Sequence, residues 1–229
     1  MVGEPVRTAR VPLDTVPADA LPAAFEATSL IQCTEVSRVP GRRRPEWRAA
    51  GSMPPPVLPA LAEFDHAEAA VRLATLLDDL GFTAEHEVTI GGGRRRYQVH
   101  GVVIPPTQRD DAGRLLAAAW RQGRRALLGT DPVGSSSPRH ARRGVLARAA
   151  WRAALLAGGR RLRADSLGVR LGDQEMAAVL VRAARLLGVT AGVLTRPGCL
   201  LVTVSDVDER TRVLRTLHTT ARPRVPALA

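Results

Sequence analysis

The residues of this chain that could do chemistry are its arginines, because every basic residue is an arginine and the chain contains no lysine. The 33 basic residues outnumber 22 acidic ones, which gives a formal net charge of +11. Guanidinium groups bind phosphate through paired hydrogen bonds, and a basic surface attracts phosphate polymers. The absence of lysine and asparagine indicates a GC-rich bacterial genome, but it does not explain the excess of basic over acidic residues. We therefore expect a nucleic acid as partner.

Clusters of arginine mark the places where phosphate contact is expected. One cluster lies in residues 42–48, a second lies on a predicted hairpin, and a third falls on the strands predicted after residue 159. The alternative for each cluster is a solvated surface that reflects base composition, and this alternative is favoured for Arg142, Arg143 and Arg148. The candidate DNA-binding residues are Arg94, Arg95, Arg96, Arg160, Arg161, Arg163 and Arg170.

Residue sets typical of catalysis or metal binding do not occur in the sequence. His86, His100 and His140 lack the spacing of metal ligands. The glycines at 91–93 lack the Lys-Ser/Thr ending of a phosphate-binding loop and predict a hairpin turn instead. Cys199 lies in a strand pattern, where a small core residue is the expected role. We expect no catalytic residue, metal, cofactor or small-molecule substrate, and aromatic residues at 3% argue against stacking on single-stranded bases.

The helices and strands predicted to position the arginines form a structural unit that occurs twice in the sequence, as a tandem repeat. Gly81 and Gly188 each follow an amphipathic helical pattern, and a shift of 107 residues places one on the other. Two strand patterns follow each glycine, at 84–90 and 94–104 and at 190–195 and 199–205, and a short helix follows each pair, at 108–122 and 208–218. Asp65 and Asp173 are predicted to cap the two amphipathic helices. The same shift aligns the apolar positions Ala69, Leu73, Leu76, Leu77 and Leu80 with Met176, Leu180, Ala183, Ala184 and Leu187.

The similarity also extends upstream, where the stretch that begins at Trp151 and ends at Gly159 resembles Trp47-Arg-Ala-Ala-Gly-Ser. Each unit is therefore predicted to run helix, two strands, helix, two strands, helix, in an α+β fold built from a tandem pseudo-two-fold pair. We expect an irregular or accessory segment at 1–40 with one short helix near 18–29. A degenerate first half at 41–128, a linker at 129–140, a second half at 141–220 and a tail at 221–229 complete the predicted organisation.

This element order resembles the LAGLIDADG homing-endonuclease fold, and the signature stretch is Leu155-Leu156-Ala157-Gly158-Gly159. Among proteins with that fold, the stretch RHARRGVLARAAWRAALLAGG is most similar to the WhiA family of actinobacterial sporulation regulators. The resemblance covers about residues 45–218. It implies a saddle of strands over DNA that carries the candidate arginines. It also implies a contact between the two signature helices, made here by Gly51, Leu155, Ala157 and Gly158.

The sequence departs from the family pattern in three ways. Active LAGLIDADG nucleases end each signature helix in an acidic residue that holds divalent metal, whereas Gly158-Gly159 is followed by Arg160-Arg161 and Gly51-Ser52 by Met53. WhiA-type proteins carry a helix-turn-helix DNA reader after the paired units, and we expect it to be absent here. The opening helix of the first half is degraded, and prolines interrupt the strands after it.

Two functions remain open. The first is a non-catalytic transcriptional or developmental regulator that contacts the phosphate backbone of duplex DNA with little base specificity. The second is a protein-interaction module that binds a regulator or itself without binding DNA. No apolar run approaches the roughly 18 residues needed to span a bilayer, and a secretory signal is not expected. Two cysteines are too few for a disulfide framework, so a bacterial cytoplasm, with association to the nucleoid if DNA is bound, is the expected location.

Overall fold

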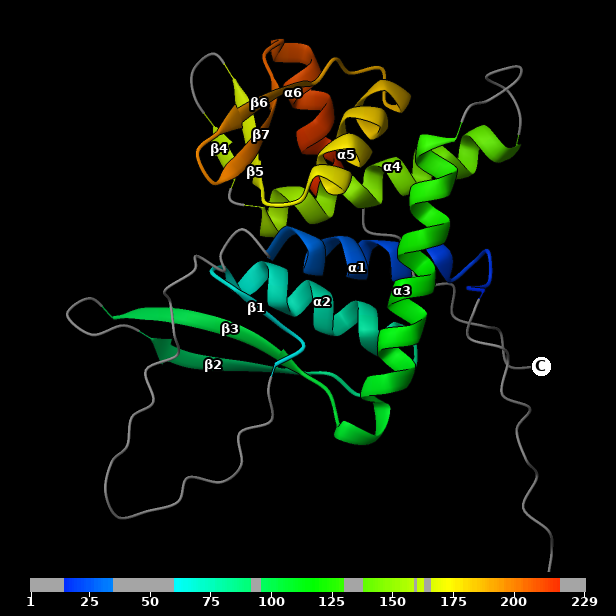
Figure 1. Ribbon diagram of the computed structural model, residues 1–229, viewed down its shortest axis with the longest axis vertical. Coiled ribbons are helices and arrows are strands. Elements are labelled where there is room, and N and C mark those ends of the chain that lie inside the picture. The colour runs from blue at the N-terminus through cyan, green and yellow to red at the C-terminus, as the bar shows by residue number, and fades with distance from the viewer. Residues whose placement is uncertain are drawn as a thin grey trace, which may run out of the picture.

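The computed structural model describes residues 15–34, 60–91, 96–129, 138–158, 160–162 and 166–218 (Figure 1). In these residues the predicted α+β class and the tandem pair of units are confirmed. The first unit comprises α1 (Leu21–Thr34), β1 (Ala62–Phe64), α2 (Ala67–Asp79), β2 (Glu85–Gly91), β3 (Tyr97–Val103) and α3 (Pro106–Leu128). The second comprises α4 (Pro138–Ala157), β4 (Arg160–Leu162), β5 (Leu167–Leu171), α5 (Gln174–Leu186), β6 (Gly192–Arg196), β7 (Cys199–Val204), α6 (Val207–Leu214) and the 3-10 helix η2 (Arg215–His218).

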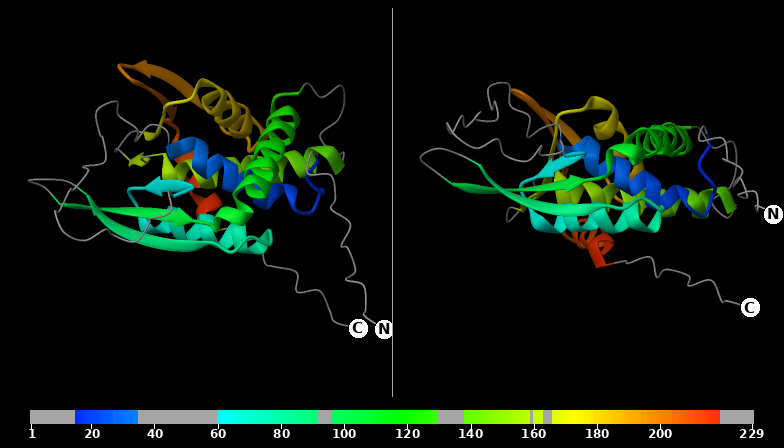
Figure 2. Two further views of the ribbon diagram at one scale, coloured as in Figure 1. Left: turned by 60° about the horizontal axis from the view of Figure 1, so that its bottom comes forward. Right: turned by 90° about the horizontal axis from the view of Figure 1, so that it is seen from below.

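Each unit contributes one antiparallel sheet, with strand order β1-β3-β2 in the first and β4-β5-β7-β6 in the second. Helices α1 and α4 lie side by side between the two sheets, and both end on the side where the strands project (Figures 1 and 2). Helix α2 packs against the first sheet and α5 against the second. The helix pair α1–α4 is therefore the centre of the molecule, and the sheets flank the ends of that pair.

The shift of 107 residues is observed in the structure for two pairs of elements and for the glycines between them. Helices α2 and α5 have 13 residues each and begin at positions 67 and 174, and β2 and β6 begin at 85 and 192. Gly81 and Gly188 both adopt positive φ angles, 87° and 67°, which residues with a Cβ rarely adopt. Asp173 caps α5 by accepting hydrogen bonds from two backbone amides, as predicted. The predicted cap at Asp65 is wrong, because His66 is the N-cap residue of α2 and makes no side-chain cap bond.

The first signature helix is α1. It confirms the short helix predicted near 18–29, but it belongs to the first unit and not to the accessory segment predicted at 1–40. Helix α1 packs against α2, α3 and α4, and its residues 24–30 are all buried. A helix buried on nearly every side lacks the periodic apolar stripe that marks a helix at a protein surface. That is why the sequence pattern favoured residues 47–50 instead. Helix α4 in turn begins at Pro138, inside the predicted linker.

The predicted contact between signature helices is only partly observed. Leu155 is buried in the hydrophobic cluster that also contains Phe25 of α1, and Ala157 packs against the clusters of both units. Gly158 instead lies against β5 of its own unit, where a Cβ would be 2.7 Å from Cγ1 of Val169. The absence of a side chain at Gly158 therefore permits close approach to the sheet, not to α1. Gly51 lies outside the described residues.

Helix α1 also packs tightly against α3. The Phe25 ring stacks on Trp120, with ring centroids 5.8 Å apart. A Cβ on Gly123 would lie 2.1 Å from the same ring. The glycine therefore sets the distance between the two helices, since any larger residue would collide with a fully buried aromatic side chain.

A buried cluster of three charges joins the two units. Glu26 of α1 accepts hydrogen bonds from Nε and Nη2 of Arg72 in α2, at 2.7 and 3.0 Å. Its second oxygen also accepts a bond of 2.6 Å from Nη1 of Arg152 in α4. Arg152 Nε in turn donates to the carbonyl oxygen of Thr216 at 2.8 Å. The hydrogen bond with Glu26 raises the pKa of Arg72, and Glu26 itself is 2% exposed, so one carboxylate holds three helices and η2 together.

Candidate nucleic-acid interface

The outward face of the second sheet is formed by alternate residues of β5, β6 and β7. The residues between them on β5 and β7, such as Val169 and Val202, are buried against the helices. Strand pairing places Arg170 opposite Leu201 on β7, and Leu201 opposite Leu194 on β6. The outward face therefore consists of Gly168, Arg170, Leu194, Arg196, Cys199, Leu201 and Thr203.

A two-residue turn places Arg196 on this face. Pro197 and Gly198 connect β6 to β7, and the φ angle of 73° at Gly198 requires a residue without a side chain. Arg196 consequently pairs with Cys199 across the hairpin. Arg170 and Arg196 therefore both rise from the outward face near the same end of the sheet.

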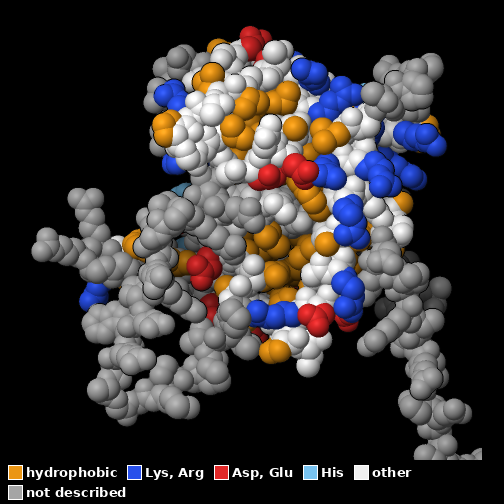
Figure 3. All heavy atoms as spheres, in the orientation of Figure 1, with side chains coloured by type: hydrophobic (Ala, Val, Ile, Leu, Met, Phe, Trp, Pro, Cys, Tyr) orange, Lys and Arg blue, Asp and Glu red, His pale blue; other side chains and the backbone are white. Residues whose placement is uncertain are grey.

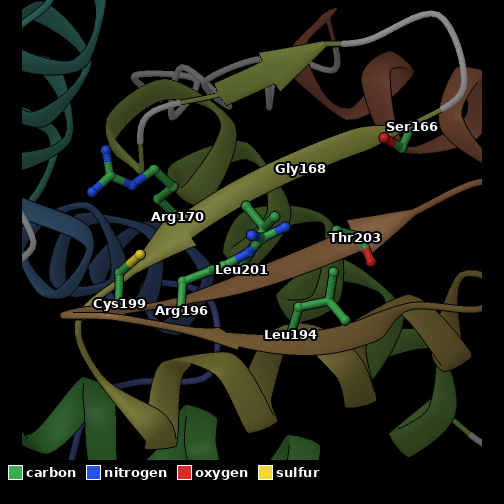
Figure 4. Close-up of a pocket in the computed structure, with 8 residues that line it drawn as sticks. All are labelled: Ser166, Gly168, Arg170, Leu194, Arg196, Cys199, Leu201 and Thr203. Atoms are coloured by element: carbon green, nitrogen blue, oxygen red, sulfur yellow. The ribbon is translucent and has the colours of Figure 1, made fainter.

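These residues enclose a shallow cleft of about 410 Å³. Arg196 extends across the strands toward Leu201, and Arg170 points toward the end of the sheet (Figure 4). The hydroxyl-bearing residues Ser166 and Thr203 line the other end of the cleft, and no carboxylate is among the lining residues. Two guanidinium groups and two hydroxyls form a set of hydrogen-bond donors that suits phosphate oxygens.

The predicted arginines are placed as follows. Arg170 lies on the outward face, and Arg160 and Arg161 lie on β4, where their backbones pair with Val169 and Gly168. Arg96 is exposed immediately before β3. Arg94, Arg95 and Arg163 lie outside the described residues. Arg196 was not among the predicted residues, although its position one residue before the Pro-Gly turn and the alternation along β6 could have identified it.

One further sequence prediction, that for Cys199, is corrected here. Cys199 was expected in the core, but it is only half-buried and lines the cleft, because the alternation that buries Val202 turns Cys199 outward. His86 and His100 form a hydrogen bond of 3.1 Å between Nε2 and Nδ1 on neighbouring strands. In the described part of the chain no group of three or more His, Cys, Asp or Glu side chains could hold a metal ion.

The first sheet presents the opposite charge. Glu63 of β1 and Glu87 of β2 pair with Gly101 of β3 from its two sides, and Glu85 pairs with Val103. All three glutamates are exposed and share one face of the sheet, since residues paired directly or two apart point the same way. Carboxylates repel phosphate, so this face of the first sheet is acidic among the described residues, whereas Arg94 and Arg95 of the same hairpin lie outside them.

The two units, joined through a central pair of helices and each flanked by an antiparallel sheet, define the LAGLIDADG fold. The crystal structure of the N-terminal LAGLIDADG domain of DUF199/WhiA matches 91% of this chain and 89% of its own length, with a TM-score of 0.51 at 12% sequence identity. The chain therefore shares the fold of that WhiA domain. At this level of identity, the match concerns architecture alone.

Other solved structures give weaker matches. Full-length DUF199/WhiA from Thermatoga maritima has a TM-score of 0.48 at 12% identity, and the match covers 90% of this chain and 63% of that one. The homing endonuclease I-DmoI in complex with DNA and Mn has a TM-score of 0.48 at 13% identity over 88% and 99% of the two chains. No protein-family model and no curated protein sequence matches the chain.

None of the helices in the described ranges has the length and apolar character needed to cross a membrane.

Proposed function

We propose that this protein is a non-catalytic, duplex-DNA-binding protein of the WhiA-like kind, acting as a transcriptional or developmental regulator in the cytoplasm of an actinobacterium. The observation that carries the proposal is the outward face of the second sheet, where Arg170 and Arg196 line a cleft without a carboxylate. The WhiA-type fold supports the same function, because its sheets flank the ends of the signature helices.

We infer the absence of catalysis from the residues after α4. A LAGLIDADG nuclease needs a carboxylate at the end of both signature helices to hold metal between them. Helix α4 is followed by Gly158, Gly159, Arg160 and Arg161, and arginine repels a metal ion. Glu35 follows α1 in the sequence and lies outside the described residues, but one carboxylate does not make the pair.

The charge difference between the sheets limits the contact to a few phosphates. The second sheet attracts the backbone through Arg170 and Arg196, whereas Glu63, Glu85 and Glu87 disfavour a phosphate on the first sheet. Backbone contact carries no sequence information of its own. We therefore propose weak, salt-sensitive binding with little preference among sequences.

A salt titration tests the proposed function. The binding of a labelled duplex of about 20 base pairs is followed by fluorescence anisotropy between about 50 and 200 mM salt. The logarithm of the association constant, plotted against the logarithm of the salt concentration, is expected to have a slope of about −0.9 for each phosphate neutralised, hence about −2 to −4 for a few phosphates. A second duplex of scrambled sequence serves as the control and should bind equally. Failure of both duplexes to bind at micromolar protein and low salt would favour the protein-interaction module over a DNA-binding protein.

A further inference from the structure

The excess positive charge of the chain is concentrated in one stretch of sequence. Residues 112–164 contain a single acidic residue, Asp131, and twelve arginines, so this stretch alone accounts for a net charge of +11, the value for the whole chain. A base-composition bias would spread arginine along the chain, and it does not remove acidic residues from one region. The arginines of the stretch are Arg114, Arg121, Arg124, Arg125, Arg139, Arg142, Arg143, Arg148, Arg152, Arg160, Arg161 and Arg163.

One of these arginines, together with Arg182, holds the fold together where three helices meet. Arg143, which the sequence suggested was plain helix surface, is buried and donates to the carbonyl oxygens of Leu127 at 3.1 Å and Gly129 at 2.7 Å. Arg182 of α5 donates to the same Leu127 oxygen at 3.3 Å. Both positive charges lie at the C-terminal end of α3, where the helix dipole favours them. These contacts fix the last turn of α3 against the first turns of α4 and against α5.

Four other arginines surround this meeting point with their side chains in solvent. Arg121 and Arg125 lie one turn apart on α3, and Arg139 and Arg142 lie on the first turns of α4; all four are exposed. In the described ranges no carboxylate pairs with any of them. Figure 3 shows basic side chains along α3 and gathered where α3 meets α4. We call this surface, Arg121, Arg125, Arg139 and Arg142 with Leu128 and Val145, the arginine junction.

The arginine junction also exposes two aliphatic side chains. Leu128 is 41% exposed and lies two turns after Arg121 on the same side of α3. Val145 is 39% exposed and lies three residues after Arg142 on α4. Phosphate backbones offer nothing to an aliphatic side chain, whereas protein–protein interfaces are enriched in arginine and have an apolar core. The composition of the junction therefore favours a protein partner over a nucleic acid.

The arginine junction is remote from the candidate DNA interface. The β-hairpins project from one end of the molecule, and the junction of α3 and α4 lies toward the other end in every view (Figures 1 and 2). A duplex on the outward face of the second sheet would leave the junction free. The two surfaces can therefore be occupied independently.

We propose that the arginine junction docks an acidic protein segment in which apolar side chains alternate with carboxylates. The carboxylates pair with Arg121, Arg125, Arg139 and Arg142, and the apolar side chains cover Leu128 and Val145. Charge complementarity of this kind raises the association rate and selects against basic partners. The proposal does not depend on DNA binding at the second sheet.

A peptide titration tests the docking proposal. The probe is a fluorescein-labelled helical peptide of about 20 residues, with Glu and Asp along one side and Leu at spacings of three and four, and the matched probe carries Gln and Asn in place of the acids. The acidic probe is expected to bind in a salt-sensitive manner, and the combined Arg121→Ala, Arg125→Ala and Arg142→Ala variant should bind it at least about tenfold more weakly. An Arg170→Ala and Arg196→Ala variant should bind the probe as the unmodified chain does.

Three results would overturn the docking proposal. The first is no binding of the acidic probe at about 100 µM protein, a concentration that detects weak association. The second is equal binding of the uncharged probe. The third is a junction variant that no longer binds duplex DNA but still binds the acidic peptide, a result that would make the junction a nucleic-acid-binding surface. Thermal unfolding by circular dichroism should be unchanged in the variant, because the three arginines are exposed.

Discussion

Replacement of Glu26 by alanine is expected to lower the free energy of unfolding by about 3–5 kcal/mol, because it leaves Arg72 and Arg152 without the carboxylate that both contact. The side chain of Arg152 is only 10% exposed, so water cannot replace the lost partner in full. Urea unfolding followed by circular dichroism measures the effect. Glu87→Ala, at an exposed position of β2, is the matched control and should change stability by no more than about 0.5 kcal/mol.

A second variant distinguishes the effect of unpaired buried charge from the effect of lost packing. Replacing all three charged residues by apolar ones of similar size, Glu26→Met, Arg72→Met and Arg152→Leu, should recover much of the lost stability, since an apolar cluster carries no desolvation cost. If Glu26→Ala alone costs less than about 1 kcal/mol, the three charges do not hold the units together, and this explanation of the contact between α1, α2 and α4 is wrong.

Reversal of both charges on the second sheet, by Arg170→Glu and Arg196→Glu, is expected to weaken duplex binding about 100-fold at low salt. Each substitution removes a charge-assisted contact and adds a repulsion, and about 1.4 kcal/mol per site corresponds to a factor of about ten. The salt dependence should become shallower at the same time, because fewer counterions are released. Anisotropy titration with the duplex measures both quantities.

The control for charge reversal changes the net charge by the same amount elsewhere. Arg121 and Arg125 lie on α3, in the arginine junction. The combined Arg121→Glu and Arg125→Glu variant should weaken duplex binding much less than the variant with both charges on the second sheet reversed. An equal loss in the two variants would mean that the overall charge of the protein, and not the outward face of the second sheet, governs DNA binding.

The repeated unit could be predicted because its helices have one buried and one exposed side. Helices α2 and α5 show the apolar stripe of such helices, and Gly81 and Gly188 mark their ends, so the shift of 107 residues was visible in the sequence. Helix α1 could not be found in the same way, since burial on nearly all sides removes the stripe. The spacing between the signature helices also differs from that shift, because α1 ends at 34 and α4 at 157.

The candidate site was predicted less completely than the fold. Arg170 was identified because it lies on the strands that follow the second signature helix. The identification of Arg196 would have required knowing the register of the hairpin with the two-residue turn, which decides the face on which each residue lies. The acidic face formed by Glu63, Glu85 and Glu87 comes from two strands separated in sequence, and only strand register brings these residues together. Net charge is a property of the whole chain, and it did not reveal that the described residues on the outward faces of the two sheets differ in sign.

The most direct test of the central claim, that duplex DNA lies on the outward face of the second sheet, uses the two cysteines as probes. Cys199 lines the cleft with Arg170 and Arg196, whereas Cys33 is fully buried, and burial, together with the negative charge of Asp173, raises the pKa of the Cys33 thiol. A maleimide should therefore label Cys199 in the folded protein and leave Cys33 unmodified. Saturating duplex is predicted to slow the labelling of Cys199 by about an order of magnitude, because access controls the reaction. An unchanged labelling rate, under conditions where anisotropy shows the duplex to be bound, would place the DNA elsewhere and contradict the proposed interface.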